Sequence, residues 1–280
     1  MSHELKARLA LEKQGFRFTH SLGQNFLLNG QVVDRIAQEA QVEPGDNILE
    51  IGPGAGVLTA ALLDRGAKVL ALELDKGLEE VLAQVAPAAQ VVFQDALKAD
   101  IAGLTRQAFG GAPFRVVANL PYYITADILT RLTRLKTPPH SILVMVQKEA
   151  AGRIMAAPGE KRYCLLAATV QNYGAPRVAF QVGPEAFTPP PHVMSVLLDI
   201  ERHAAPPAQA RDEETFRKVM AACFAMRRKT LVNNLCAAFG LDRGAAAGLV
   251  EGCGLDAHVR GEALTLEQMA RVADALTTEA

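Results

Sequence analysis

Short, almost continuous apolar runs recur along the first 200 residues, separated by stretches with helical spacing. The runs are rich in Val, Ile and Leu and contain few polar positions, as is typical of strands covered on both faces. Seven strands are predicted, at residues 47–51, 68–72, 90–94, 114–119, 141–147, 177–182 and 193–200.

The segments between the runs predict how the strands are connected. Residues 56–65, 76–85 and 125–135 suit crossover helices, and strands that alternate with helices build a parallel, doubly wound sheet. The link between the last two strands, GPEAFTPPPH, is too short for a crossover helix. That pair is therefore predicted to be antiparallel and to close the sheet.

The pattern changes after the last predicted strand. Residues 201–214 are rich in Ala and Pro and then become charged, which is typical of a linker. No strand pattern follows, and apolar side chains recur at helical spacing: Phe216, Val219, Met220, Cys223 and Phe224. We expect an α/β domain over residues 1–203, with residues 1–25 as an N-terminal arm, and a small all-helical domain over residues 204–280.

Composition narrows the class of protein. Half of the 280 residues are hydrophobic, so a packed core is expected. No apolar run approaches the ~20 residues of a membrane span, and the charged N-terminus lacks a secretion signal. The four cysteines are far apart and the six histidines show no ligand spacing. We therefore expect neither disulfides nor a metal site, and a cytoplasmic location.

The net charge of −1 conceals an uneven distribution of charged residues. Residues 151–235 carry 11 basic and 7 acidic side chains, whereas residues 236–280 carry 3 basic and 7 acidic ones. A polyanion could dock on the basic middle of the chain. The counts alone fit scattered, solvated charge equally well.

A glycine-rich turn follows the first predicted strand. The stretch LEIGPGAG places Gly52, Gly54 and Gly56 directly before a helix-like run. Glycine allows a sharp turn and lets a ligand approach without Cβ clashes. The spacing is GxGxG and not the GxGxxG of NAD-binding folds, since residue 57 is valine. By itself, the turn also fits an ordinary tight strand–helix connection.

Acidic residues stand at the ends of the next two strands. Glu73 ends the second and Asp95 follows the third. One carboxylate can accept hydrogen bonds from the ribose hydroxyls of a nucleoside cofactor, and the next could meet the adenine amino group. Each acid alone also fits a solvated turn, but together with the glycine turn they favour a cofactor site. Glu50, on the first strand, either binds the cofactor's ammonium group through water or only anchors the turn.

The fourth strand ends in NLPYYI, residues 119–124. If the cofactor is S-adenosylmethionine, the Asn119 side-chain oxygen and the Leu120 carbonyl could hold an adenine amine for methyl transfer. Pro121 has a fixed φ and would hold that carbonyl outward, and Tyr122 could stack on the base. The motif alone also fits a strand-end turn whose rings pack on a neighbouring helix.

Taken in order, these motifs resemble those of the KsgA/RsmA family of 16S ribosomal RNA adenine N6-dimethyltransferases. The resemblance starts upstream, at HSLGQNFL (20–27), and covers nearly the whole chain. It continues through EAFTPPPHVMSVLL (185–198), FAMRRKTLVNNL (224–235) and RGEALTLEQMARVADAL (260–276). It implies a Rossmann-like, S-adenosylmethionine-dependent methyltransferase sheet followed by a helical domain that contacts rRNA and the ribosome.

The resemblance also implies roles for single residues. The implied cofactor-binding residues are Gln24, Asn25, Leu27, Gly52, Gly54, Gly56, Glu73, Asp95 and Asn119. The implied target-amine site, in which an aromatic ring sandwiches the flipped base against Tyr122, consists of Asn119, Leu120, Pro121, Tyr122 and Phe187. The implied phosphate contacts are Arg227, Arg228 and Lys229, although such a charge run by itself is usually a solvated helix face.

The implied activity places two methyl groups on N6 of each of two adjacent adenines in a hairpin loop of 16S rRNA. The implied partner is the assembling small ribosomal subunit, and the implied protein is a monomer that needs neither a metal nor a membrane. His192 departs from the family's usual lysine and Cys164 from its glycine, and Tyr123 receives no role.

Four other functions stay open at this stage. A related enzyme methylates 23S rRNA and confers macrolide resistance; the helical domain with RRKTL favours the 16S enzyme over it. A DNA adenine methylase usually carries xPPY in place of NLPY. An assembly factor whose methylation is incidental would bind the same subunit. An NAD-linked oxidoreductase shares the fold but is disfavoured by the GxGxG spacing.

Overall fold

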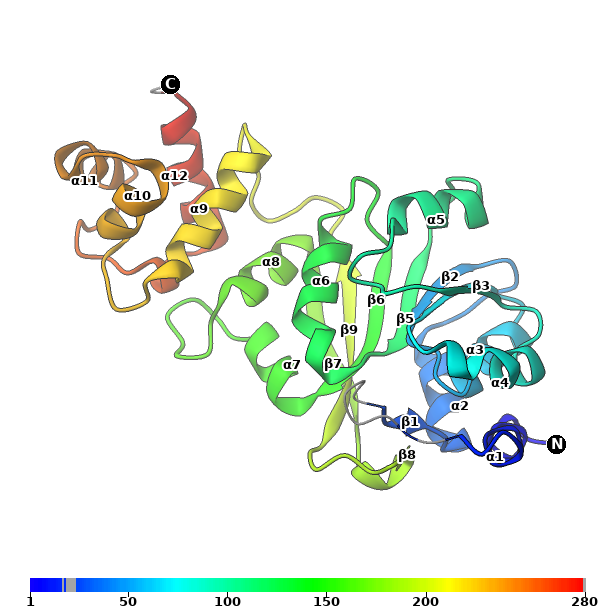
Figure 1. Ribbon diagram of the computed structural model, residues 1–280. Helices are drawn as coiled ribbons and strands as arrows, with labels where there is room; N and C mark the ends of the chain where they lie inside the picture. The colour runs from blue at the N-terminus through cyan, green and yellow to red at the C-terminus, as the bar shows by residue number, and fades with distance from the viewer. Residues whose placement is uncertain (17, 19–23, 279–280) are drawn as a thin grey trace. The chain divides into compact units, whose positions relative to one another are not determined.

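The computed structural model describes residues 1–16, 18 and 24–278, and the chain divides into two compact units (Figure 1). The first unit comprises Met1–Ala151 and Pro176–Arg202, and the second comprises Gly152–Ala175 and His203–Ala280. The segment Gly152–Ala175 thus groups with the helical part of the chain, although it was expected within the α/β domain. The first four residues of the HSLGQNFL motif lie outside the described residues.

The first unit is built on a seven-stranded sheet with the order β4-β3-β2-β5-β6-β9-β7. All seven predicted strands are present: β2 (Asn47–Ile51), β3 (Lys68–Glu73), β4 (Gln90–Phe93), β5 (Arg115–Asn119), β6 (Ser141–Gln147), β7 (Gly174–Val182) and β9 (Ser195–Arg202). The pairs from β4 to β6 are parallel, whereas β9 runs antiparallel to β6. The predicted doubly wound sheet with an antiparallel end is confirmed.

Helices pack on this sheet, whose central strands β2, β3, β5 and β6 are buried along most of their length. The helices of the first unit are α1 (His3–Lys13), α2 (Gly30–Glu39), α3 (Val57–Asp64), α4 (Glu79–Val85), α5 (Ile101–Phe109), α6 (Thr125–Thr133) and α7 (Lys148–Ile154), which runs on into the second unit. Side-chain caps begin several of them: Asn29 Oδ1 accepts from Val32 N at α2, and Asp100 Oδ1 accepts from Gly103 N at α5.

A second, two-stranded sheet was not predicted. Its strands, β1 (Phe26–Leu27) and β8 (Phe187–Thr188), are antiparallel, with Phe26 opposite Thr188 and Leu27 opposite Phe187. Two residues are too few to show a hydrophobic period. The pair nevertheless joins the N-terminal arm to the segment between β7 and β9.

The second unit is helical. Its helices are α8 (Leu165–Tyr173), α9 (Glu213–Ala225), α10 (Leu231–Phe239), α11 (Arg243–Gly252) and α12 (Leu266–Thr278). The predicted apolar face of α9 is buried, with Phe216, Val219 and Cys223 in a core shared with Tyr163. A Cβ on Gly261 would lie 2.2 Å from the Cys223 carbonyl oxygen, so glycine permits the chain to cross α9 closely. Over the described part of the chain, we find no helix long and apolar enough to span a bilayer.

Candidate functional site

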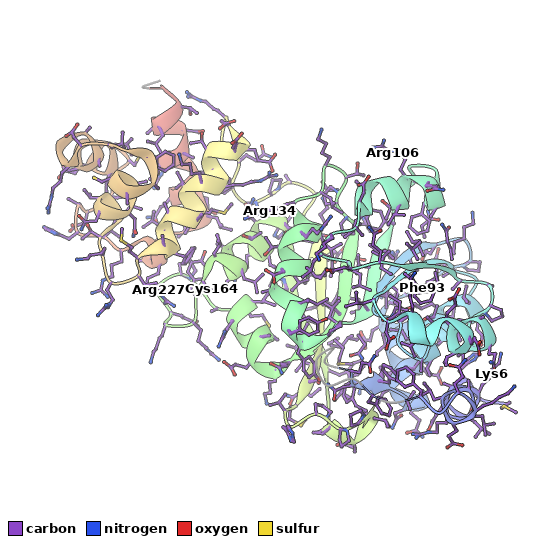
Figure 2. The ribbon with its side chains drawn as sticks, in the orientation of Figure 1. Lys6, Phe93, Arg106, Arg134, Cys164 and Arg227 are labelled. Carbon is purple, nitrogen blue, oxygen red and sulfur yellow. The ribbon has the colours of Figure 1, made fainter. Side chains whose placement is uncertain are left out.

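A cavity opens at the carboxyl edge of the sheet, where doubly wound folds bind ligands. Its empty volume is about 750 Å³, a figure that includes the open space at its mouth. Residues at or just beyond the ends of β2, β3, β4 and β5 line it. Most of the predicted site residues meet there: Gln24, Asn25, Gly52, Gly54, Glu73, Asp95, Asn119, Leu120, Pro121 and Tyr122. Phe93, labelled in Figure 2, ends β4 directly before this wall.

Three of the residues predicted to bind the cofactor or the target base do not line the cavity. Leu27 and Phe187 face each other in the β1–β8 pair, and both are buried in the hydrophobic core. A Cβ on Gly56 would lie 3.0 Å from Leu82 and 3.5 Å from Val85. Gly56 therefore allows the start of α3 to pack against α4.

The first two glycines of the turn do face the cavity, and both need to be glycine. Gly52 and Gly54 have φ values of +71° and +54°, which side-chain-bearing residues rarely adopt. A Cβ on Gly54 would lie 3.0 Å from the Phe26 ring, and one on Gly52 would lie 3.3 Å from Pro121 Cδ. The turn is thus packed between β1 and the NLPY motif.

The Glu73 carboxylate is held by main-chain donors in the cavity wall. Its Oε1 accepts from Leu74 N at 2.8 Å and Asp75 N at 2.9 Å, and its Oε2 accepts from Gly54 N at 3.1 Å. Burial raises the pKa of Glu73, while these three hydrogen bonds favour the ionised form. The three donors fix the orientation of the carboxylate. Since a carboxylate accepts about four hydrogen bonds, it can still accept one from a ligand hydroxyl.

Glu50 lies on β2 just before the turn and is fully buried, with 1% exposure. Its Oε2 and the Thr59 hydroxyl have no hydrogen-bond partner within the described residues. Burial raises the pKa of Glu50 to about 8, while the neighbouring Thr59 hydroxyl lowers it and the charge of Glu73 adds to the rise. An orphaned carboxyl oxygen below a ligand turn fits a cofactor that carries a cationic group.

The NLPY motif connects β5 to the arm and to a short turn. Asn119 Nδ2 donates to the Asn25 carbonyl at 3.2 Å. With its nitrogen bound there, the Asn119 amide has its Oδ1 to offer to a donor in the cavity. Pro121, with φ −57°, starts the 3-10 turn η3 (Tyr122–Ile124), and Ile124 N donates to its carbonyl at 3.2 Å.

The two tyrosines of η3 differ in environment. Tyr122 is half-buried, and burial raises its pKa although its hydrogen bond to Ser195 lowers it. Tyr123 is 55% exposed and also lines the cavity. Burial of its hydroxyl, followed by the charges of Asp95 and Glu73, raises the pKa of Tyr123. Tyr123 thus lies on the side of the cavity where Asp95 and Glu73 stand, a position that the sequence left open.

Several further cavity residues were missed because they flank the motifs and are apolar or amide: Phe26, Ile51, Leu72, Leu74, Gln94, Ala96 and Ile124. Their only sequence signal is adjacency to a motif residue. Gln24, in the cavity wall, donates from Nε2 to Asp75 Oδ2 at 2.7 Å and so connects the arm to the residues that follow β3. The described part of the chain contains no group of three or more His, Cys, Asp or Glu residues able to hold a metal ion.

The predicted phosphate contacts lie in the second unit, after α9. Arg227, labelled in Figure 2, forms an ion pair from Nε to Glu262 Oε2 at 2.5 Å and donates from Nη2 to the Lys161 carbonyl at 2.8 Å. Arg228 and Lys229 are exposed. Of the two departures from the family pattern, Cys164 is half-buried at the start of α8, and His192 is exposed.

A seven-stranded, doubly wound sheet with a cavity at its carboxyl edge is the architecture of Rossmann-like folds, a class that includes the S-adenosylmethionine-dependent methyltransferases. A family model described as "Ribosomal RNA adenine dimethylase" matches residues 15–278. The chain is 41% identical over 273 residues to the ribosomal RNA small subunit methyltransferase A of Streptococcus equi subsp. zooepidemicus, which covers 95% of this chain and 94% of that one. The chain therefore belongs to the ribosomal RNA adenine dimethylase family.

Two crystal structures share the fold. A dimethyladenosine transferase from Plasmodium falciparum aligns with a TM-score of 0.70 and 22% identity, over 86% of this chain and 94% of that one. The 23S rRNA methyltransferase ErmE aligns with a TM-score of 0.65 and 24% identity, over 90% of this chain and 100% of that one. At such low identity, these likenesses concern the fold alone.

Proposed function

We propose that this protein is an S-adenosylmethionine-dependent adenine N6-dimethyltransferase of small-subunit rRNA. Its substrate would be two adjacent adenines in a hairpin loop near the 3′ end of 16S rRNA, in the assembling subunit. The observation that carries the proposal is the meeting of two half-sites in one cavity: the tips of β2, β3 and β4, and the NLPY motif at the end of β5. The Streptococcus relative, named for the small subunit, supports the choice of 16S over 23S rRNA.

The proposed cofactor site follows the cavity wall. Glu73 would accept hydrogen bonds from the ribose hydroxyls, Asp95 from the adenine amino group, and the turn at Gly52 and Gly54 would hold the methionine end. Gln24 and Asn25 would cover this site, and Glu50 would face the cofactor's ammonium group. When bound, S-adenosylmethionine supplies a methyl group on a positively charged sulfur.

The acceptor half would use hydrogen-bond acceptors in place of a base. Asn119 Oδ1 and the Leu120 carbonyl would accept both N–H bonds of the adenine amine, which favours a pyramidal nitrogen. Held there, the nitrogen lone pair would take the methyl group that the bound cofactor supplies, with the S–C bonding electrons kept by the sulfur, and the proton would pass to water afterwards. Most of the rate gain would come from positioning and from fixed dipoles.

The proposed RNA contacts extend beyond the cavity. The target adenine must leave its stack, which a hairpin loop makes less costly, and Tyr122 would take its face. Residues 204–280, with Arg228 and Lys229, would bind phosphates of the subunit. We propose further that the protein acts as a monomer in the cytoplasm.

The deciding experiment is transfer of labelled methyl groups from S-adenosylmethionine to undermethylated small subunits, with the product mapped by mass spectrometry. We expect dimethyladenosine at two adjacent positions of 16S rRNA. Label on 23S rRNA instead would support the macrolide-resistance type of enzyme, and intact dimethylation of 16S rRNA in a deletion strain would overturn the proposal.

Replacement of Asn119 by Ala tests the acceptor half. We expect Asn119→Ala to lower methyl transfer by about 10²- to 10³-fold, as when a preorganised polar group at the reacting atoms is lost, with subunit binding largely intact. Asn47→Ala is a matched control, because its Nδ2 makes a similar bond to the Pro113 carbonyl at 3.0 Å but lies outside the cavity. Loss of subunit binding in Asn119→Ala would show that Asn119 is structural.

A further inference from the structure

The hydroxyl of Tyr122 has a defined partner. Tyr122 Oη and Ser195 Oγ are 2.6 Å apart, within hydrogen-bond distance. Ser195 is completely buried, whereas Tyr122 is half-buried and lines the cavity. Ser195 itself does not line the cavity, so it can act on a ligand only through the tyrosine.

Ser195 is fixed by the sheet. It is the first residue of β9 and pairs with Gln147, the last residue of β6. The residue before it, Met194, accepts a hydrogen bond at its carbonyl from Lys148 N at 3.0 Å. Because β9 lies inside the sheet, between β6 and β7, the Ser195 hydroxyl is a rigid reference point.

Tyr122, by contrast, stands on a short 3-10 turn rather than on a strand. The turn fixes its Cα, but the ring could still rotate about the bonds that join it to the backbone. The hydrogen bond to Ser195 holds the far end of the ring. The direction of the ring axis, from Cβ to Oη, is therefore held before a base arrives. Because a phenol oxygen forms its hydrogen bonds near the plane of its ring, rotation about that axis is limited as well.

We propose that Ser195 is a positioning residue for methyl transfer, which holds the ring of Tyr122 at the place where the target adenine stacks. The inference rests on the proposed function. It links two motifs that the sequence presents separately, NLPYYI and FTPPPHVMS, through one hydrogen bond. Positioning of this kind affects rate, since small errors in the placement of the reacting atoms lower it steeply.

A double-mutant cycle tests the inference. We expect Ser195→Ala and Tyr122→Phe each to lower kcat on small subunits about five- to tenfold, the effect of one lost hydrogen bond. The double variant should be no slower than either single one, and the affinity for S-adenosylmethionine should stay unchanged. Multiplied losses in the double variant would overturn the proposal, because Ser195 would then act independently of the Tyr122 hydroxyl.

Ser141→Ala is the matched control. Ser141 lies at the opposite end of the same strand pair, opposite Glu201, and away from the cavity. We expect Ser141→Ala to retain wild-type kcat. A loss in Ser141→Ala equal to that in Ser195→Ala would show that the β6–β9 pair responds to any such change, and would also overturn the proposal.

A second readout does not depend on methyl transfer. The chain has only four tyrosines, so NMR with ring-labelled tyrosine resolves the signal of Tyr122. We expect Ser195→Ala to shift and broaden that signal and Ser141→Ala to leave it unchanged. An unchanged signal in Ser195→Ala would overturn the anchoring role, even in an active rRNA methyltransferase. A shifted signal in a protein that transfers nothing to rRNA would support the anchor and refute the proposed function.

Discussion

Glu50 and Glu73 show two ways to bury a carboxyl group on neighbouring strands, β2 and β3. Glu73 receives three main-chain N–H donors, and its charge is stabilised at the cavity wall. Glu50 has an orphaned Oε2 below that wall. The first arrangement suits a fixed acceptor for hydroxyl groups, and the second suits a group that responds to pH or to a cation.

The pH dependence of stability provides a test for Glu50. Its pKa rises from 4.5 to about 8 on folding, so between these values the folded chain holds a proton that the unfolded chain has lost. Stability must therefore fall as the pH rises through this window. Relative to Glu50→Gln, we expect the wild type to lose up to about 1.4 kcal/mol per pH unit. Urea unfolding of both proteins from pH 5 to 8 measures the difference.

The control is Glu251→Gln, which replaces an exposed glutamate of α11. Its stability should follow that of the wild type at every pH. Parallel curves for Glu50→Gln and the wild type would contradict the raised pKa of Glu50.

At the scale of elements, the β1–β8 pair has only two residues on each strand, yet it connects segments that are far apart in the sequence. It joins the arm that precedes the sheet to the segment that precedes β9, and it places Phe26 against Gly54. The resemblance of motifs had assigned Leu27 to the cofactor and Phe187 to the target base. Both side chains are buried in the core, at 6% and 4% exposure.

Two substitutions of Phe187 separate packing from catalysis. We expect Phe187→Ala to lower the free energy of unfolding by about 3–5 kcal/mol, the usual cost of an emptied aromatic site. Phe187→Leu keeps most of the volume, so it should retain methyl transfer to within about threefold. Denaturant unfolding and the methyl-transfer assay measure the two effects. Phe109→Leu, buried on α5 against Phe114, is the control for loss of a buried ring elsewhere in the first unit. A stable but inactive Phe187→Leu would restore the stacking role.

Sequence pattern predicts the strands of the large sheet well but says little about the small one. Seven apolar runs were sufficient to find β2 to β7 and β9, because strands covered on both faces are continuously hydrophobic. The order of strand tips also predicted that Glu73, Asp95 and Asn119 would meet. A motif cannot reveal whether a side chain faces the cavity or the core, so it could not show that Leu27 and Phe187 are buried in the core. Nor could it show that Gly56 packs against α4. Ser195 escaped notice because its role depends on a contact 73 residues away in sequence.

For the whole molecule, the two units carry separate tasks in the proposed function: the cavity lies in the first and the basic run after α9 in the second. Arg227 is already paired with Glu262, so it serves the helical unit itself. Arg228 and Lys229 remain exposed for phosphates.

The salt dependence of RNA binding tests this division. We expect the double variant Arg228→Ala/Lys229→Ala to weaken binding to the small subunit and to reduce the slope of log K against log salt by about 2, one for each phosphate contact. Filter binding across a salt series measures the slope. Arg106→Ala/Lys136→Ala removes two exposed cations from the first unit and should leave the slope unchanged. Equal slopes for all three proteins would remove these two residues from the interface.

The continuity of the cavity has a consequence for inhibitor chemistry. Since Asn119 and Glu73 line one continuous cavity, a bisubstrate compound that links an adenine N6 to an S-adenosyl scaffold would occupy both halves together. Joining the two ligands makes the second contact intramolecular, so affinity gains by a large effective concentration without any new interaction. The hydrogen bond from Asn119 Nδ2 to the Asn25 carbonyl would lie beside the linker. Substituents on the linker that contact this bond are where selectivity between related methyltransferases would be designed.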